Sequence, residues 1–589
     1  MVMEIKKILR EPLFYLLPLL AVAYLIVIPA KVEILDAKTT RSNVTENIKL
    51  PYSNSSDIKE EFLISFKLDV KNNGSVKYNL IPDDCIQEIL INEKKFPIEG
   101  VKGICNYIRG AYFDFSEYTQ KGLNDFRIRI INNGGPGGLR IEVPYNGFKS
   151  LSIMHYIFTF FLLLSIALIL KKFKFKFIAN MIILLGISVR LITYAYMGPT
   201  QSPFDVGAHL EYIQIVAEEQ RVPTINEGWS TYHPPLYYLI SAAIKNVADS
   251  YEPGFTGRIL QQFNLLLSFG SVIFGVALII GLFGNRWVAY LAALASVLWP
   301  GFVLAGPRIN NDIFFYFGAL FCMFFAQRYW LSHKNSDVLF ASIGASIAIA
   351  AKSTGVVILG VWAIIYVLNV LRSLKICSLR TLFVSIFIIA LFAGFSNYRQ
   401  ISTIFEGGKV ELVQPINSLN SALRVQNTVG NYLYFDIKDY LLVPYTSAWN
   451  DKGGRQYFWN YLLKSSSSLH GETEFEALPI GGIISTGLNI CVLLIFLLAL
   501  WGMIHVKAKE FPALLFTIGL FAALISFRVM YPYSCHNEFR FIFPVMFPLA
   551  YFAASGAQLF LNYRIRKFAY IILLSFAGLS VIFILGKAL

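Results

Sequence analysis

The stretch KKFKFKFIANMIILLGISVRLITYAYM (residues 171–197) places four lysines directly before an apolar run that is long enough to cross a bilayer. A membrane-spanning helix needs about 20 predominantly apolar residues, and lysine and arginine gather in the loops on its cytoplasmic side. Of the 589 residues, 56% are hydrophobic and 15% are charged. Because a soluble domain carries roughly 25% charged residues, the sequence predicts a polytopic, all-α membrane protein.

About thirteen apolar segments meet or approach the length of a span. The segment 337–352 is short, and we include it because the polar AKSTG at its end is typical of a helix break that lines a cavity. The thirteen segments are residues 12–30, 151–170, 177–197, 259–283, 286–306, 312–331, 337–352, 354–372, 380–396, 483–503, 511–529, 540–560 and 567–586.

The basic residues agree with this count. They lie at the N-terminus and after each even-numbered segment, in KKFKFKF, GNR, SHK, RSLKICSLR, HVKAKE and NYRIRK. A cytoplasmic N-terminus then puts all of these loops inside, as the positive-inside rule requires. The formal charge of +14 is explained by topology, and we expect no nucleic acid partner. The regions outside are 31–150, 198–258, the PRINND turn, AKSTG, 397–482 and MYPYSCHNEFR.

The chain therefore divides into an N-terminal membrane helix (1–30), an extracytoplasmic domain between the first two spans (31–150) and a transmembrane domain (151–589). Alternating stretches such as FLISFKLDV and turn clusters such as NNGGPGG predict that region 31–150 is a β-sandwich. Cys85 and Cys105 in this domain either form a disulfide or remain free thiols.

Two external loops carry the polar residues that suggest chemistry. In region 198–258, FDVGAHLEYIQIVAEEQ can form an amphipathic helix with Asp205, His209 and Tyr212 on one face. It is followed by TYHPPLYY with His233, and by an apolar segment that is too short to span comfortably, so we expect interfacial helices here. In region 397–482, YFWNYLLKSS predicts a third interfacial helix.

These motifs resemble the GT-C glycosyltransferases that use polyprenyl-phosphate sugars, such as protein O-mannosyltransferases and lipid A aminoarabinose transferases. Asp205 in FDVGAH and TYHPPLYY match the family's external acidic and Pro-Pro-Leu motifs, Arg258 in GRILQQF opens the next span, and Asp312 in RINND matches a second acid. The resemblance covers residues 177–560 in order and spacing. Val206 stands where the family often has a second acid, so an acid pair at 205–206 is unsupported. The β-domain resembles jelly-roll carbohydrate-binding modules, and a lid or spacer is its alternative role.

The resemblance implies an integral membrane glycosyltransferase that transfers a sugar, with inversion and without a metal or cofactor, from a polyprenyl phosphate to a lipid, glycan or protein acceptor. The active site is then extracytoplasmic, in a bacterial or archaeal inner membrane or its equivalent. A carboxylate can remove the acceptor proton, and cations can hold the departing phosphate. The predicted catalytic residues are Asp205 and Asp312, the phosphate ligands are Lys352, Arg540 and Arg308, and the substrate-binding residues are His233, His209, Tyr212, Glu538 and His536.

Each of these residues also has an ordinary structural explanation. Asp205 and Asp312 stand where helices begin, and aspartate is a common helix cap. Lys352 and Arg540 lie at membrane edges, where snorkelling anchors are found. Glu538 can form an ion pair with Arg540.

Two further points bound the function. The three histidines lie in separate segments without metal-ligand spacing, so no metal site is predicted. Arg190, inside the span 177–197, either reaches the interface or pairs with Asp205. The alternative functions are a lipid or sugar transporter or flippase, although we see no internal repeat, and a non-catalytic membrane protein that binds glycans.

Overall fold

The chain divides into two compact units, one of which contains all ten described strands and the other most of the helices. The predicted spans 12–30 and 151–170 and the lysine-rich loop 171–176 lie outside the described residues. The computed structural model describes residues 32–48, 50, 52–54, 59–70, 76–101, 104–105, 110–133, 137–142, 177–199, 205–225, 227–251, 256–284, 286–405, 421–449, 451, 454–467, 475 and 478–588.

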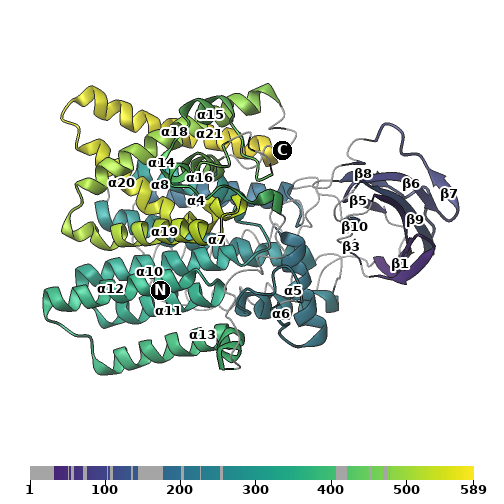
Figure 1. Cartoon of the computed structure of the whole chain (residues 1–589), viewed down its shortest axis with the longest axis horizontal. Coiled ribbons are helices and arrows are strands. Elements are labelled where there is room, and N and C mark those ends of the chain that lie inside the picture. Colours follow the sequence, from purple (N-terminus) through teal and green to yellow (C-terminus); the bar gives the residue numbers. More distant parts are fainter. Residues whose placement is uncertain are drawn as a thin grey trace, which may run out of the picture. The chain divides into compact units, whose positions relative to one another are not determined.

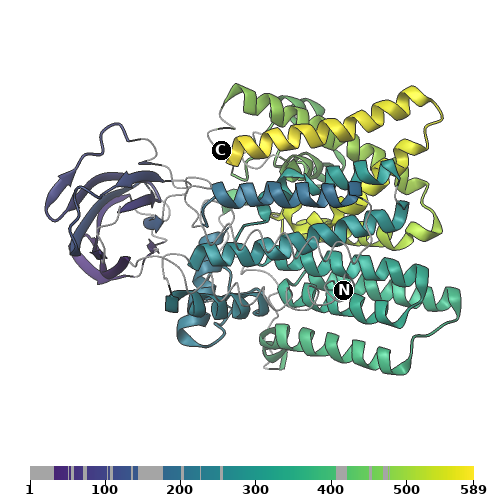
Figure 2. The same cartoon turned by 180° about the vertical axis from the view of Figure 1, so that it is seen from behind.

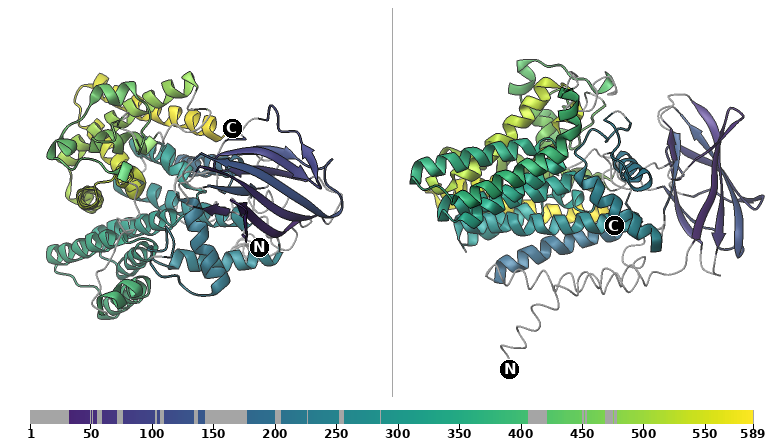
Figure 3. Two further views of the ribbon diagram at one scale, coloured as in Figure 1. Left: turned by 45° about the vertical axis from the view of Figure 1, so that its right-hand side comes forward. Right: turned by 90° about the horizontal axis from the view of Figure 1, so that it is seen from below.

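The strands form two antiparallel sheets. One sheet has the strand order β2-β1-β4-β9-β6-β7 and the other the order β3-β10-β5-β8. Figure 3 shows the sheets of this unit from two directions. The strands are β1 Val32–Arg41, β2 Val44–Asn47, β3 Tyr52–Asn54, β4 Glu60–Val70, β5 Lys77–Pro82, β6 Cys85–Ile91, β7 Lys94–Phe96, β8 Ala111–Asp114, β9 Gly122–Asn132 and β10 Gly137–Glu142.

The two sheets enclose one apolar core, as the alternating pattern of the sequence predicts. In β4, Phe62, Ile64, Phe66 and Leu68 are buried while the residues between them are more exposed, because successive side chains of a strand point to opposite faces. The other strands of that sheet and strands of the second sheet add aromatic and branched residues to the same core. The unit is therefore a β-sandwich.

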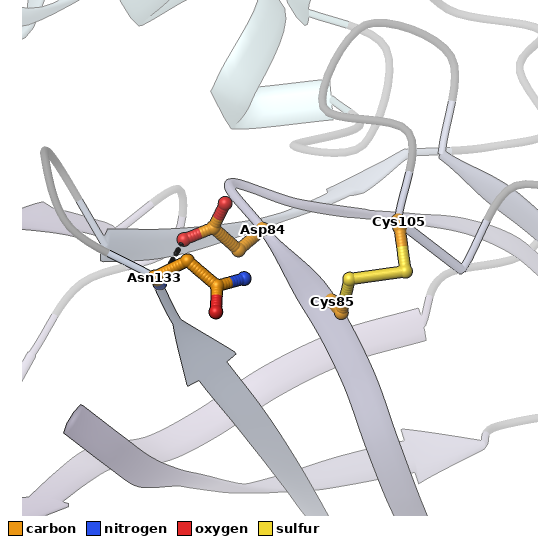
Figure 4. The surroundings of a disulfide bond; sticks show 4 residues. All are labelled: Asp84, Cys85, Cys105 and Asn133. Atoms are coloured by element: carbon orange, nitrogen blue, oxygen red, sulfur yellow. Dashed lines mark hydrogen bonds between the residues drawn. A yellow bond between two sulfur atoms is a disulfide. The ribbon is translucent and has the colours of Figure 1, made fainter. Parts of the chain in front are cut away.

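Of the two alternatives for Cys85 and Cys105, the structure has the disulfide. Cys85 at the start of β6 is bonded to Cys105, which ties the segment 104–105 to the strand (Figure 4). A backbone hydrogen bond of 2.8 Å from Ile86 to Ile104 runs beside it. On the other side of Cys85, a carboxylate oxygen of Asp84 accepts a hydrogen bond from the backbone N–H of Asn133.

The second unit is built from long apolar helices that lie side by side with nearly parallel axes, among them α10, α11 and α12 (Figures 1 and 2). The helices are α4 Phe177–Tyr196, α5 Val206–Glu219, α6 Leu236–Tyr251, α7 Thr256–Phe283, α8 Trp287–Val297, α9 Pro300–Ala305, α10 Asp312–Ser332, α11 Asn335–Ala351, α12 Gly355–Ser373, α13 Leu379–Phe405, α14 Val429–Leu433, α15 Ile437–Leu442, α16 Phe458–Ser467, α18 Pro479–Ile504, α19 Phe511–Met530, α20 Met546–Gln558 and α21 Tyr563–Ala588. Short 3₁₀ helices are η4 Ser421–Leu423, η5 Ala508–Glu510, η6 Ser534–Asn537 and η7 Phe539–Val545.

Eight helical segments of the described chain are long and apolar enough to cross a membrane. Their outward surfaces are apolar as well: along α13, Phe383, Phe387 and Leu391 are more than half exposed. Large exposed apolar faces of this kind are costly in water and suit a lipid environment. The chain is therefore an integral membrane protein.

The predicted count of thirteen spans is not confirmed. The segment 286–306 is divided into α8 and α9 at Leu298 and Trp299, and α11 has only 17 residues. The segment 312–331 forms the 21-residue α10, but polar residues such as Gln327 and Arg328 lower its hydropathy. The three predicted interfacial segments are helical, as α5, α6 and α16, and the AKSTG break separates α11 from α12.

Candidate active site

Asp205 stands directly before α5 but does not cap it through its side chain. Its backbone adopts the left-handed conformation, with φ 59° and ψ 15°, which is uncommon for a residue other than glycine. Its carboxylate makes no capping hydrogen bond and instead lies 3.6 Å from the guanidinium of Arg540. The side chain is 39% exposed. An unusual backbone conformation thus presents an accessible carboxylate to a cation.

Asp312, the second predicted acid, forms a buried ion pair with Lys352. The Nζ atom of Lys352 donates to a carboxylate oxygen of Asp312, and the two side chains are only 9% and 5% exposed. Asp312 is the first residue of α10, and Lys352 directly follows α11. Because the ammonium group is buried and paired, Lys352 is not a snorkelling anchor, and the carboxylate of Asp312 has a role other than a simple helix cap.

Close packing of α10 against α11 brings this pair together. A Cβ atom on Gly318 would lie 2.7 Å from the backbone of Ala348, and one on Gly344 would lie 2.5 Å from the backbone of Cys322. Glycines let two helix backbones approach closely in a membrane. The side-chain amide of Asn311 also donates to the carbonyl of Ala351 at 2.8 Å. The start of α10 and the end of α11 are thereby held side by side.

Arg540 lies at the centre of the charged cluster, in the 3₁₀ helix η7. Its Nε atom is 2.5 Å from Glu538, so the expected ion pair is present, and its backbone carbonyl accepts a hydrogen bond of 2.6 Å from Tyr316 of α10. Three carboxylates, those of Glu538, Asp205 and Asp312, are close enough to act on its charge. Its side chain is 14% exposed. Arg540 is therefore a largely buried, paired cation and not a membrane anchor.

One aromatic ring connects the two cations. The Nζ atom of Lys352 lies 4.4 Å from the centre of the Phe541 ring, and the guanidinium carbon of Arg540 lies 5.2 Å from it. Both distances are within the range of cation–π attraction. The Asp312–Lys352 and Glu538–Arg540 pairs are thus two parts of one site.

Two of the three predicted histidines, His209 and His233, lie in a stack of aromatic rings. A ring nitrogen of His209 is 2.8 Å from the hydroxyl of Tyr238, and the ring of Tyr212 stacks on Tyr238 with centres 3.7 Å apart. The His233 ring stacks on His209 at 5.8 Å. Burial lowers the pKa of His209 to about 3 and that of His233 well below its usual value. Both imidazoles are therefore neutral at neutral pH.

Arg399 holds the loop that carries His233. It lies on α13, two residues after the non-helical Asn397. Its guanidinium donates to the backbone carbonyls of Pro223, Thr231 and His233 at 2.6 to 2.7 Å. This role could not be predicted from the sequence, because an arginine at the end of an apolar segment is ordinarily a snorkelling anchor.

Two further predicted residues, Arg308 and His536, make hydrogen bonds through or to backbone carbonyls. Arg308 is buried in the turn between α9 and α10, where its carbonyl accepts a hydrogen bond from Asn264; burial and the nearby Arg540 lower its pKa to about 10. His536 contacts the carbonyl of Tyr531 at 3.0 Å and the ring of Phe527.

Arg190 takes neither of its predicted roles. It is fully buried within α4, where it donates to Ser268 and to the carbonyls of Gly186 and Val297 at 2.9 Å, so it pairs with internal polar groups and not with Asp205. Within the described residues, no group of three His, Cys, Asp or Glu side chains is placed to hold a metal ion.

No protein-family model matches the chain, and no curated protein matches it. Among solved structures, the arabinosyltransferase EmbB from Mycobacterium smegmatis, determined by electron cryo-microscopy, matches 85% of this chain with a TM-score of 0.38 and 10% sequence identity. The match covers 42% of EmbB, so the chain spans less than half of its length. A likeness of this size assigns no family, and the functional proposal rests on the chain's own residues.

Proposed function

We propose that the chain is a membrane glycosyltransferase that moves a sugar from a polyprenyl phosphate to a hydroxyl group of a lipid, glycan or protein acceptor on the extracytoplasmic side. The observation that carries the proposal is the position of Asp205. It is the most exposed of the three carboxylates around Arg540, at 39% against 5% for Asp312 and 5% for Glu538. It stands where an aqueous acceptor and a membrane-bound donor can both approach.

The reaction needs one base and one group that stabilises a leaving phosphate. The oxygen of the acceptor hydroxyl attacks the anomeric carbon of the donor, and Asp205 takes the hydroxyl proton. The bond from the anomeric carbon to the phosphate oxygen breaks. A positioned carboxylate contributes about 10²–10⁴ to such a rate. The leaving polyprenyl phosphate carries the released electron pair and is met by Arg540 and Lys352, whose donors suit phosphate oxygens.

The ion pairs determine how the donor can bind. Lys352 is neutralised by Asp312, and Arg540 is held by Glu538 through Nε while its Nη2 atom faces Asp205. A donor phosphate that contacts Nη2 replaces Asp205 as its partner. Donor binding thereby releases the carboxylate of Asp205 for the acceptor, and Glu538 and Asp312 keep the two cations in place.

The neutral histidines suit the sugar and not the phosphate. Since His209 and His233 are uncharged at neutral pH, they offer hydrogen bonds without adding charge to the site. Their stack with Tyr212 and Tyr238 is buried, with His233, at 8%, its most exposed ring, so a sugar would meet the stack at the edge of His233. We assign these residues to the binding of the sugar ring.

The test is Asp205→Asn in protein reconstituted in nanodiscs. Asparagine keeps the size of aspartate but cannot take a proton at neutral pH, so we expect transfer from a polyprenyl-phosphate sugar to fall by about 10²–10⁴ with donor affinity unchanged or improved. Glu219→Gln, which removes an exposed carboxylate at the far end of α5, is the matched control.

Transfer by Asp205→Asn at the wild-type rate would contradict the base role. If the wild-type protein catalyses no transfer but moves the lipid-linked sugar between leaflets in a proteoliposome, the chain is a transporter and the proposal is wrong.

A further inference from the structure

Arg528 is a buried cation without an acidic partner among the described residues. It lies in the last turn of α19, two residues before the helix ends, and is 1% exposed. Its Nε and Nη1 atoms have no hydrogen-bond partner in the described part of the chain. The groups that act on its charge are Tyr432, Cys535 and Tyr461, all of which are neutral at neutral pH.

Three other buried cations of the helical unit have acidic or carbonyl partners within the protein. Lys352 is paired with Asp312, and Lys464 with Asp439 at 2.8 Å. Arg399 donates to three backbone carbonyls. Burial of an unpaired charge costs several kcal/mol, and charged residues inside membrane segments are therefore functional candidates. Arg528 differs from these three cations because two of its guanidinium nitrogens, Nε and Nη1, have no hydrogen-bond partner in the described part of the chain.

Helix-end anchoring does not explain this residue. A snorkelling arginine keeps its guanidinium in water or among head groups, whereas the side chain of Arg528 is fully enclosed. The lipid-facing positions of the same turn are Val529 and Met530, which are 46% and 63% exposed. Arg528 thus points into the protein, at a depth close to the end of a spanning helix.

We propose that Arg528 binds a phosphate group supplied by a ligand, at a site separate from the Asp205–Arg540 centre. A guanidinium matches phosphate oxygens in geometry and charge. The end of a membrane-spanning helix lies at the level of lipid head groups, so a phosphate on a lipid or on a head-group-sized ligand lies at the depth of Arg528 and binds it when the side chains that cover the guanidinium move aside.

The two sites are neighbours in the fold. Helix α19, which carries Arg528, packs against η7, which carries Arg540. A ligand at Arg528 is therefore close to the reacting groups. One consequence rests on the proposed function: if the donor phosphate occupies Arg540 and Lys352, the phosphate at Arg528 belongs to the acceptor, which is then a phosphate-bearing lipid or glycan.

The experiment measures binding and needs no transfer. The full chain is purified in dodecyl maltoside and chloride buffer, and its thermal midpoint is recorded against inorganic phosphate, and separately against phosphatidylglycerol. The variants are Arg528→Met and the control Arg372→Met, which removes a charge from the last turn of α12. We expect phosphate to stabilise the wild-type protein and Arg372→Met, and Arg528→Met to need at least about tenfold more phosphate for the same shift.

Loss of phosphate binding by Arg528→Met can be told apart from loss of folding. Methionine replaces an unpaired buried charge with an apolar side chain, so Arg528→Met is expected to melt at or above the wild-type temperature without phosphate. A shift from inorganic phosphate alone identifies a soluble phosphate group as the ligand, and a shift from phosphatidylglycerol identifies a lipid head group. If neither shifts the wild-type midpoint, or if Arg528→Met responds like the control, the proposal is overturned. Failure of sugar transfer would leave this result unaffected.

Discussion

Removal of Lys352 alone is expected to destabilise the protein, whereas removal of Lys352 together with Asp312 is expected to restore most of the loss. The two side chains form an ion pair and are 9% and 5% exposed. Loss of one partner of a buried pair costs about 3–5 kcal/mol, because the other charge remains buried. Loss of the attraction between Lys352 and the Phe541 ring at 4.4 Å adds about 0.5–2 kcal/mol.

The assay is a double-mutant cycle with Lys352→Met, Asp312→Asn and the double variant. Thermal unfolding is recorded in detergent, and donor affinity is measured on each variant that remains folded. Each single variant is expected to lose about 3–5 kcal/mol, and the double variant is expected to lose clearly less than the sum of the two. Full additivity would show that the two side chains do not interact, and would refute the geometry of the pair.

The double variant also separates structure from function. If Lys352 only neutralises Asp312, a stable double variant binds the donor as the wild-type protein does. If Lys352 holds the donor phosphate, the double variant is folded but binds the donor about tenfold or more weakly, because a charge-assisted hydrogen bond contributes about 1.5–3 kcal/mol. Wild-type donor affinity in a stable double variant would remove Lys352 from the proposed phosphate site.

Three further predictions follow from named features. Single cysteines at Glu219 and Lys438 are expected to react with an impermeant reagent from the extracytoplasmic side and one at Lys375 from the cytoplasmic side; the reverse pattern would refute the predicted topology. Burial depresses the pKa of His209 and His233 below 6.5, so below that pH the unfolded state binds more protons than the folded state. The free energy of unfolding is therefore expected to fall as the pH drops from 6.5, by up to about 1.4 kcal/mol per pH unit for each histidine. A His209→Gln, His233→Gln variant that keeps the same slope in thermal unfolding between pH 6.5 and 4 would contradict this. Gly344→Ala is expected to lower the free energy of unfolding by more than about 1 kcal/mol and to weaken donor binding, because the new Cβ atom would lie 2.5 Å from the backbone of Cys322. Gly360→Ala is the control: its Cβ atom would meet no neighbouring atom, so neither quantity is expected to change.

Features that depend on local pattern could be predicted from the sequence. Period-2 alternation predicted strands such as β4, and apolar runs predicted the helices, because hydrophobic periodicity reflects which face of an element is buried. The polar AKSTG segment predicted the break between α11 and α12. The disulfide between Cys85 and Cys105 required only an oxidising compartment and two cysteines in one domain.

Features that depend on contacts between distant segments could not be predicted. The pairing of Lys352 with Asp312 arises from the glycine contact between α10 and α11, and neither residue carries a local signal for the other. The same holds for Arg399, whose three carbonyl partners lie about 170 residues earlier in the chain. The left-handed backbone conformation of Asp205 could not be predicted from the sequence either, because only a minority of aspartates adopt this conformation.

The arrangement of charges explains why the acids of the site are not equivalent. Asp312 and Glu538 are buried beside the cations that they neutralise, so the ionised forms of these carboxylates are already committed to structural pairs. Asp205 differs in all respects that matter for a base: it is exposed, its contact with Arg540 is the longer one at 3.6 Å, and its helix-cap function is unused. A contact of that length with a partly exposed carboxylate is weaker than the two short buried pairs, so under the proposed function the phosphodiester of the donor can replace Asp205 at Arg540 at small cost. If phosphate displaced Asp312 or Glu538 from its cation instead, a buried carboxylate would be left without a partner, at a high cost in free energy. If the proposed function is right, we therefore expect the incoming phosphate to displace Asp205 and not the two buried acids, and the carboxylate of Asp205 to become available to the acceptor once the donor is in place.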